Sequence, residues 1–210
     1  MRIAGAVALV IGADSAVGAA VVRGLLARGV GKVYADAHLD SCEIALSGAV
    51  PLFVAVGKQA RAATLARDLT DVNLLVNCLV TRYDTASSRD GTPPQARDPH
   101  TPSVGRVLKL IDAFAPVLSA NGGGAVVNVL CMLHADHLSE YAPATPSRPL
   151  AEWMLAAGMG DRLAAQQTQL LFLGAQLVVG AGFQARRDRS ALAGHVAMRL
   201  LNQLEAGGAG

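Results

Sequence analysis

The chain has 210 residues, 52% of them hydrophobic, and a formal net charge of +2. This length suits one α/β domain with a sizeable core, and the composition excludes an intrinsically disordered protein. Because the charges are scattered and no apolar run reaches the roughly 18 residues of a membrane span, we expect neither a nucleic acid nor a membrane as partner.

The expected elements follow one another in a regular order. The first apolar run, 6–11, is short and is followed by Asp14 and several glycines, so we expect a strand there and not a leader peptide. Apolar runs and helical spacing extend this pattern along the chain. Strands are expected at 6–11, 32–37, 49–56, 73–80, 124–131 and 169–179, and helices at 16–29, 58–69, 103–120, 149–166 and 191–207.

This alternation of strands and helices predicts one Rossmann-like α/β domain over residues 1–210, a doubly wound parallel sheet with helices on both faces. Residues 81–102 are polar and hold four prolines, so we expect a loop. Arg186, Arg187 and Arg189 form a short basic cluster that we expect in a solvated loop.

A glycine-rich turn, "GADSAVG", stands between the first strand and the first helix, with Gly12 and Gly18 at its ends. Such turns allow a pyrophosphate to approach the backbone at a helix N-terminus. Two glycines at this spacing are weak evidence alone, because tight strand–helix turns use glycine anyway.

The chain resembles a short-chain dehydrogenase/reductase from end to end. The resemblance rests on "ALVIGADSAVGAAVVRGLLARG", "DVNLLVNCLV", "AFAPVLSANGGGAVVNVL" and "LLNQLEAG", which match that family in order and spacing. It implies a Rossmann fold, an NAD(P) cofactor, and carbonyl reduction with a tyrosine as proton donor. A lysine, a serine and an asparagine assist the tyrosine in that family.

The cofactor positions that the resemblance implies are mostly changed. Ala16 replaces the middle glycine of the turn, Ala55 replaces the aspartate that meets the adenine, and Leu79 and Val80 add bulk where backbone lies against the ribose. Asp36 lies one residue before the position expected for the acid that binds the ribose. We therefore expect no cofactor, or NAD(P) only if the remnant site still functions. The remnant is Gly12, Gly18, Asn77 and Asp36.

The four catalytic positions are also changed. Counted from the "VVNVL" strand and from Pro116, they are occupied by Ser103, Cys131, Ala144 and Arg148 instead of asparagine, serine, tyrosine and lysine. Because the methyl group of Ala144 has no proton to give, this position cannot act as the proton donor. Tyr141 lies three residues before Ala144, but it lacks a lysine four residues on.

The segment 131–141 offers the remaining polar candidates. Cys131, His134, Asp136 and His137 lie within seven residues, a spacing that could hold zinc or pair a thiol with a histidine base. The simpler interpretation is a polar loop at the end of a strand, and we expect no metal. The odd count of three cysteines, without metal-finger spacing, favours reduced thiols and a cytoplasmic location.

Three functions remain open. The chain is expected to be a non-catalytic structural or regulatory subunit; the alternatives are a fold repurposed for non-redox chemistry, such as isomerisation or cyclisation, and an atypical NAD(P)-dependent oxidoreductase. A shortened substrate-binding region near 180–190 agrees with lost catalysis.

The sequence also predicts an oligomer. The helix at 103–120 has two apolar stripes, one through Leu108 and Ile111 and one through Leu110 and Phe114, so it should be buried on two sides. In the family that the chain resembles, this helix and the one at 149–166 pair with their copies in a neighbouring subunit. The partner would be a second copy or an active relative.

Overall fold

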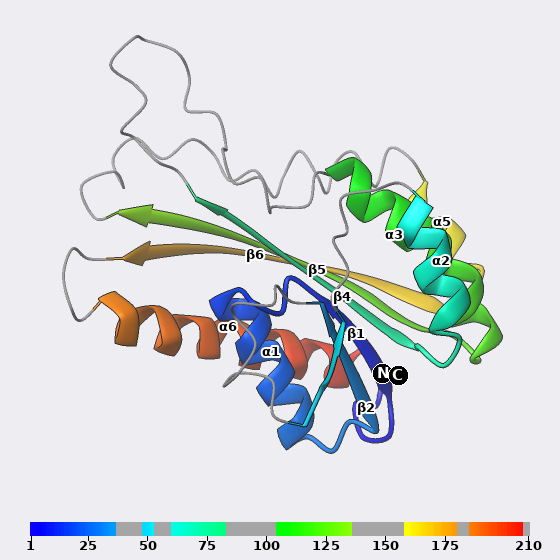
Figure 1. Ribbon diagram of the computed structural model, residues 1–210, viewed down its shortest axis with the longest axis horizontal. Coiled ribbons are helices and arrows are strands. Elements are labelled where there is room, and N and C mark those ends of the chain that lie inside the picture. The colour runs from blue at the N-terminus through cyan, green and yellow to red at the C-terminus, as the bar shows by residue number, and fades with distance from the viewer. Residues whose placement is uncertain (37–47, 53–59, 83–103, 136–157, 180–184, 208–210) are drawn as a thin grey trace, which may run out of the picture.

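The protein is built around one parallel sheet of six strands in the order β3-β2-β1-β4-β5-β6 (Figure 1). The structure, a computed structural model, describes residues 1–36, 48–52, 60–82, 104–135, 158–179 and 185–207. The predicted doubly wound sheet is confirmed. The strands are β1 (Val7–Ile11), β2 (Lys32–Asp36), β3 (Val50–Leu52), β4 (Leu74–Arg82), β5 (Gly124–Ala135) and β6 (Thr168–Val179).

The helices cover both faces of this sheet and enclose two apolar layers. One layer lies beneath α1 (Ala16–Ala27) and α6 (Ala185–Ala206), and the other beneath α2 (Ala60–Asp68), α3 (Val104–Ala120) and α5 (Met159–Ala164). No helix in the described part of the chain is long and apolar enough to cross a membrane.

The central strands carry apolar side chains on both faces, which explains their continuous apolar sequences. In β1, Ala8 and Val10 belong to the layer under α1 and α6, whereas Leu9 and Ile11 belong to the layer under α3. All four side chains are buried. A strand with this environment is recognisable from sequence without any polar–apolar alternation.

Helix α3 is buried on two sides, as its stripes predict, but its own chain supplies the cover. Leu110 and Phe114 of the second stripe are 1% and 0% exposed within the single chain. They share a core cluster with Leu65 of α2, Met159 of α5 and several sheet residues. This stripe therefore does not need another subunit for its burial, because α2 and α5 flank the helix. Association through α3 stays a prediction.

Several element ends differ from the predicted ones. β4 continues to Arg82 and β5 to Ala135, because the two strands stay paired with each other through Thr81↔Met132 and Arg82↔Leu133. Residues 81–82 and 132–135 are therefore strand and not loop. Helix α6 begins at Ala185, so the basic cluster at 186–189 lies in helix and not in a loop.

The helix expected at 149–166 ends earlier than predicted. α5 stops at Ala164, and Gln167 then adopts a left-handed backbone with φ of 56° before β6 starts. Residues 149–157 lie outside the described residues, as does the second half of the strand expected at 49–56.

Candidate functional site

The turn between β1 and α1 is closed by the chain's own hydrogen bonds. Ser15 caps helix α1: its Oγ accepts a 2.9 Å bond from the Gly18 amide and donates a 2.8 Å bond to the Gly12 carbonyl. The Ala13 amide donates to the carbonyl of Asp36, at the end of β2, across 2.9 Å. The Ser15 amide also donates to the Gly12 carbonyl across 3.1 Å, so three amides of this turn are already bonded within the protein.

Both glycines of the turn are required by packing. Gly12 has a φ of 72°, and a Cβ atom there would lie 2.5 Å from the carbonyl oxygen of Cys78 in β4. A Cβ atom on Gly18 would overlap the carbonyl oxygen of Gly12. The turn predicted from sequence is present, but its glycines are explained without a ligand.

Tested against a dinucleotide pyrophosphate, this turn fits poorly. Ala16, the first residue of α1, is exposed and carries a methyl group where the family's turn has a glycine. Asp14 is exposed beside it, and its negative charge opposes a phosphate. The segment 12–18 contains no lysine or arginine to offset that charge. The amides of Ala16 and Val17 are first-turn helix donors that could face an anion.

Asp36, the candidate ribose ligand, is the last residue of β2 and is partly buried. By strand alternation it shares a face with Tyr34, which belongs to the layer under α2 and α3. The opposite face of β2, formed by Val33 and Ala35, packs in the layer under α1. Asp36 therefore lies on the sheet face opposite to α1.

Asn77 is fully buried and forms a pair with Asn128 on the neighbouring strand. The two residues are direct register partners of β4 and β5, and the Asn77 Nδ2 donates a 2.9 Å hydrogen bond to the Asn128 Oδ1. The Asn77 Oδ1 has no hydrogen-bond partner within the described structure. Sequence reasoning identified Asn77 as a remnant but missed its partner.

Three of the four implied catalytic positions lie outside the described residues: Ser103, Ala144 and Arg148. The same holds for the substitutes Tyr141 and His137 and for Ala55.

Cys131 and His134 lie on β5, where they pair in register with Ala175 and Val178 of β6. Among the described residues, no group of three or more His, Cys, Asp or Glu side chains could hold a metal ion. Leu79 and Val80 lie within β4, paired with Leu130 and Cys131 of β5.

A polar cluster that sequence reasoning missed lies at the start of β2. Lys32 Nζ donates a 2.7 Å hydrogen bond to the Tyr34 hydroxyl and lies 3.0 Å from Asp71 Oδ2. The Tyr34 hydroxyl donates to Asp71. The hydrogen bonds with Tyr34 and Asp71 raise the pKa of Lys32.

Desolvation alone would raise the pKa of Asp71, but the hydrogen bonds from Lys32 and Tyr34 outweigh it and lower that pKa. Lys32 and Tyr34 are two positions apart on a strand, which sequence shows, but Asp71 is joined to them only by the fold. This cluster connects the start of β2 to the turn before β4.

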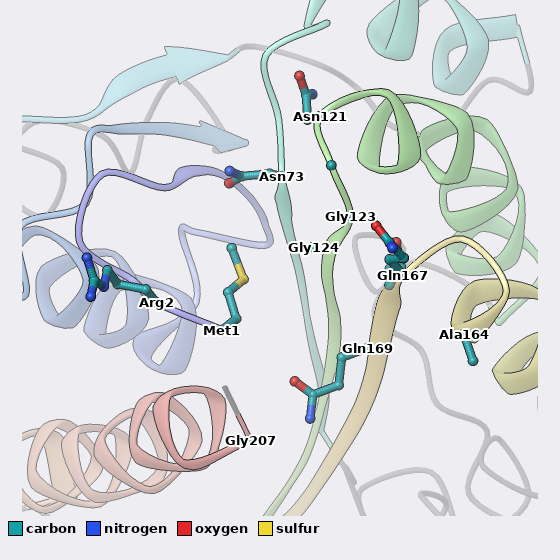
Figure 2. Close-up of a pocket in the computed structure, with 12 residues that line it drawn as sticks. Met1, Arg2, Asn73, Asn121, Gly123, Gly124, Ala164, Gln167, Gln169 and Gly207 are labelled. Atoms are coloured by element: carbon teal, nitrogen blue, oxygen red, sulfur yellow. The ribbon is translucent and has the colours of Figure 1, made fainter. Parts of the chain in front are cut away.

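A pocket of about 630 Å³ lies at the amino ends of β5 and β6 and is also lined by Asn73, just before β4 (Figure 2). Its polar lining includes Asn73, Asn121 and Gln169. Asn73 accepts a bond from the Val7 amide, and Asn121 donates to the carbonyls of residues 70 and 72, so these amides hold turns together. None of the residues predicted as a site lines this cavity.

Solved structures of other proteins share this architecture. No family model matches the sequence, and no curated protein matches it at a significant level. Solved structures do match. A short-chain dehydrogenase from Burkholderia cenocepacia in complex with NADP has a TM-score of 0.60 and 23% identity, over 96% of this chain and 99% of that one.

Two further structures agree. A short-chain dehydrogenase from Streptomyces avermitilis has a TM-score of 0.63 and 18% identity, over 96% of this chain and 84% of that one. A hydroxysteroid dehydrogenase from Escherichia coli has a TM-score of 0.59 and 17% identity, over 95% and 90%. The chain therefore has the fold of the short-chain dehydrogenases/reductases.

Proposed function

We propose that this chain is a non-catalytic subunit built on the short-chain dehydrogenase/reductase fold, and that it works by assembly and not by hydride transfer. The observation that carries the proposal is the residue at the proton-donor position. Cys131 stands on β5 three residues after Asn128, where the family that the chain resembles has its serine. Thirteen residues later comes Ala144, whose methyl group has no proton to donate.

The residues at the family's cofactor-binding positions support the same proposal independently. The fold itself admits a cofactor, since the Burkholderia protein was crystallised with NADP. The difference lies in the residues of this chain: Ala16 and Asp14 stand at the glycine turn, and bulky Leu79 and Val80 lie within β4. Loss of the proton donor and of the cofactor contacts together is expected when selection on redox chemistry has ended.

An activity assay tests this function. The purified protein is incubated with NADH or NADPH and a panel of ketones and aldehydes, with the Escherichia coli hydroxysteroid dehydrogenase as positive control. We expect no cofactor oxidation above the rate without protein. Oxidation that depends on substrate, and that is lost in Tyr141→Phe, would overturn the proposal and establish an atypical oxidoreductase with Tyr141 as its proton donor.

A further inference from the structure

The side chain of Asn121 fastens the turn after α3 to the turn before β4. Asn121 follows the last residue of α3, and its Nδ2 donates hydrogen bonds of 2.8 Å to the Thr70 carbonyl and 3.0 Å to the Val72 carbonyl. The two acceptors lie 51 and 49 residues earlier in the chain, so this amide joins segments that only the fold brings together. We call these two hydrogen bonds the Asn121 clamp.

Asn121 is also the only asparagine in the sequence that is followed by glycine. In an Asn-Gly pair the backbone nitrogen of the glycine can attack the asparagine Cγ, because glycine has no side chain to hinder the approach. The glycine nitrogen loses its proton, the Cγ–Nδ2 bond breaks, and the side-chain nitrogen leaves with that proton as ammonia. Water then opens the resulting cyclic succinimide at either carbonyl carbon, which gives aspartate or isoaspartate. The reaction consumes water and needs no other reagent.

The structure leaves this Asn-Gly pair open to water. Asn121 and Gly122 are both exposed, and both line the pocket at the amino ends of β5 and β6 (Figure 2). Gly122 has a φ of 81°, and a Cβ atom there would have no heavy atom of the described structure within 4 Å. The glycine is therefore required by its left-handed backbone and not by close packing, so the turn itself keeps a reactive pair in place.

The same turn restrains both reacting groups. The Gly122 amide donates to the Ser119 carbonyl across 3.1 Å, and the Gly123 amide donates to the Leu118 carbonyl across 2.9 Å. These are the two hydrogen bonds of a Schellman motif, which ends α3. The nucleophilic nitrogen is held by the first of them, and the Asn121 side chain is held by the clamp. The reaction therefore requires the turn to open locally.

We propose that Asn121 deamidates spontaneously in this protein, at a rate set by the opening of its turn, and that the reaction releases the Asn121 clamp. An aspartate has no donor for the carbonyls of Thr70 and Val72, so its oxygens would face theirs. The new negative charge also lies at the carboxyl end of α3, where the helix dipole disfavours an anion. The isoaspartate product adds a methylene group to the backbone of the turn as well.

Peptide mass spectrometry of the purified protein, incubated at mildly alkaline pH with and without denaturing urea, tests the proposal. The peptide with Asn121 should gain the mass that marks an amide replaced by an acid, and a protein isoaspartate methyltransferase should label it. The change should be slower in the folded protein than in urea. Asn202 is the matched control, because it is exposed, accepts a hydrogen bond from Arg28 and is followed by glutamine. It should remain intact over the same time.

Thermal unfolding measures what the modification does to the protein. Asn121→Asp should unfold about 4 °C or more below the parent, because two hydrogen bonds are lost and a charge is added at a helix end. Asn121→Ala loses the same hydrogen bonds without adding the charge, so its unfolding temperature should lie between the other two. The modified fraction of the incubated parent should unfold below the unmodified fraction.

Three results would overturn the inference. One is a folded protein in which Asn121 is modified no faster than Asn202. Another is a rate in the folded protein that equals or exceeds the rate in urea, since the hydrogen bonds of the turn would then not control the reaction. The third is an Asn121→Asp variant as stable as the parent, because the clamp would then contribute nothing. None of these results bears on cofactor binding, so this inference and the proposed function fail separately.

Discussion

Asn77 donates a hydrogen bond of 2.9 Å to Asn128 across the two central strands, inside a layer that is otherwise apolar. The pair occupies one row with Ile11 and Phe172, its register partners on β1 and β6. Only one end of the Asn77 amide is bonded within the described structure. Replacing one member of the pair should therefore not cost the same stability as replacing the other.

Replacing Asn128 should destabilise the protein more than replacing Asn77. Asn128→Leu leaves both ends of a buried amide unpaired, which costs about 1–3 kcal/mol. Asn77→Leu removes the unpaired oxygen together with the donor and takes a partner only from the Asn128 Oδ1, and so should cost less. Urea unfolding of both variants measures the difference in the free energy of unfolding. The account of this pair is wrong if Asn77→Leu is the more destabilised.

Phe114 belongs to the core of the single chain, so its substitution should affect folding and not association. Phe114→Ala should lower the free energy of unfolding by about 3–5 kcal/mol, because a fully buried ring is removed. Lys109→Ala, on the exposed strip of the same helix, should change it by less than about 0.5 kcal/mol. Thermal unfolding checks both. A Phe114→Ala variant as stable as the parent would mean that this face is not packed within the chain.

The sequence predicted the sheet and its helices because their signals are local. β1 and β4 are buried on both faces, and their continuous apolar runs report that burial directly. The cover of α3 was not predictable, since a helix sequence shows that two sides are apolar but not which element fills each side. The Asn128 partner of Asn77 and the Asp71 partner of Lys32 are 51 and 39 residues distant, and only the fold joins them.

Asp71 should contribute an acid-sensitive part of the stability. Its pKa is lowered in the folded protein from an ordinary value of 3.8. The contribution is therefore present above pH 3.8 and is lost as the pH falls through the folded-state pKa. Because its side chain is 42% exposed, the contribution should be at most about 1 kcal/mol.

Asp71→Asn tests this contribution. The stability difference between the parent and the variant, from urea unfolding at a series of pH values, should be largest near neutral pH and shrink below pH 3.8. Tyr34→Phe serves as a companion variant, since it removes one of the hydrogen bonds that lower the pKa of Asp71. A difference that grows as the pH falls would show that the sign of the shift is wrong.

Restoring the catalytic residues should not restore catalysis. The variant Cys131→Ser, Ala144→Tyr, Arg148→Lys supplies a proton donor and its helpers, but the glycine turn still carries Ala16 and β4 still carries Leu79 and Val80. With no bound cofactor there is no hydride source. NADPH oxidation with a panel of ketones should stay at background. Activity in the folded triple variant would show that the cofactor contacts had survived.

Titration calorimetry with NAD, NADH, NADP and NADPH tests the central claim most directly, because hydride transfer requires one of these molecules to bind. The Burkholderia cenocepacia short-chain dehydrogenase, whose structure contains NADP, serves as the positive control. For the present protein we predict no saturable heat with any of the four dinucleotides, at concentrations that saturate the control. A dissociation constant in the micromolar range for any one of them would contradict the account.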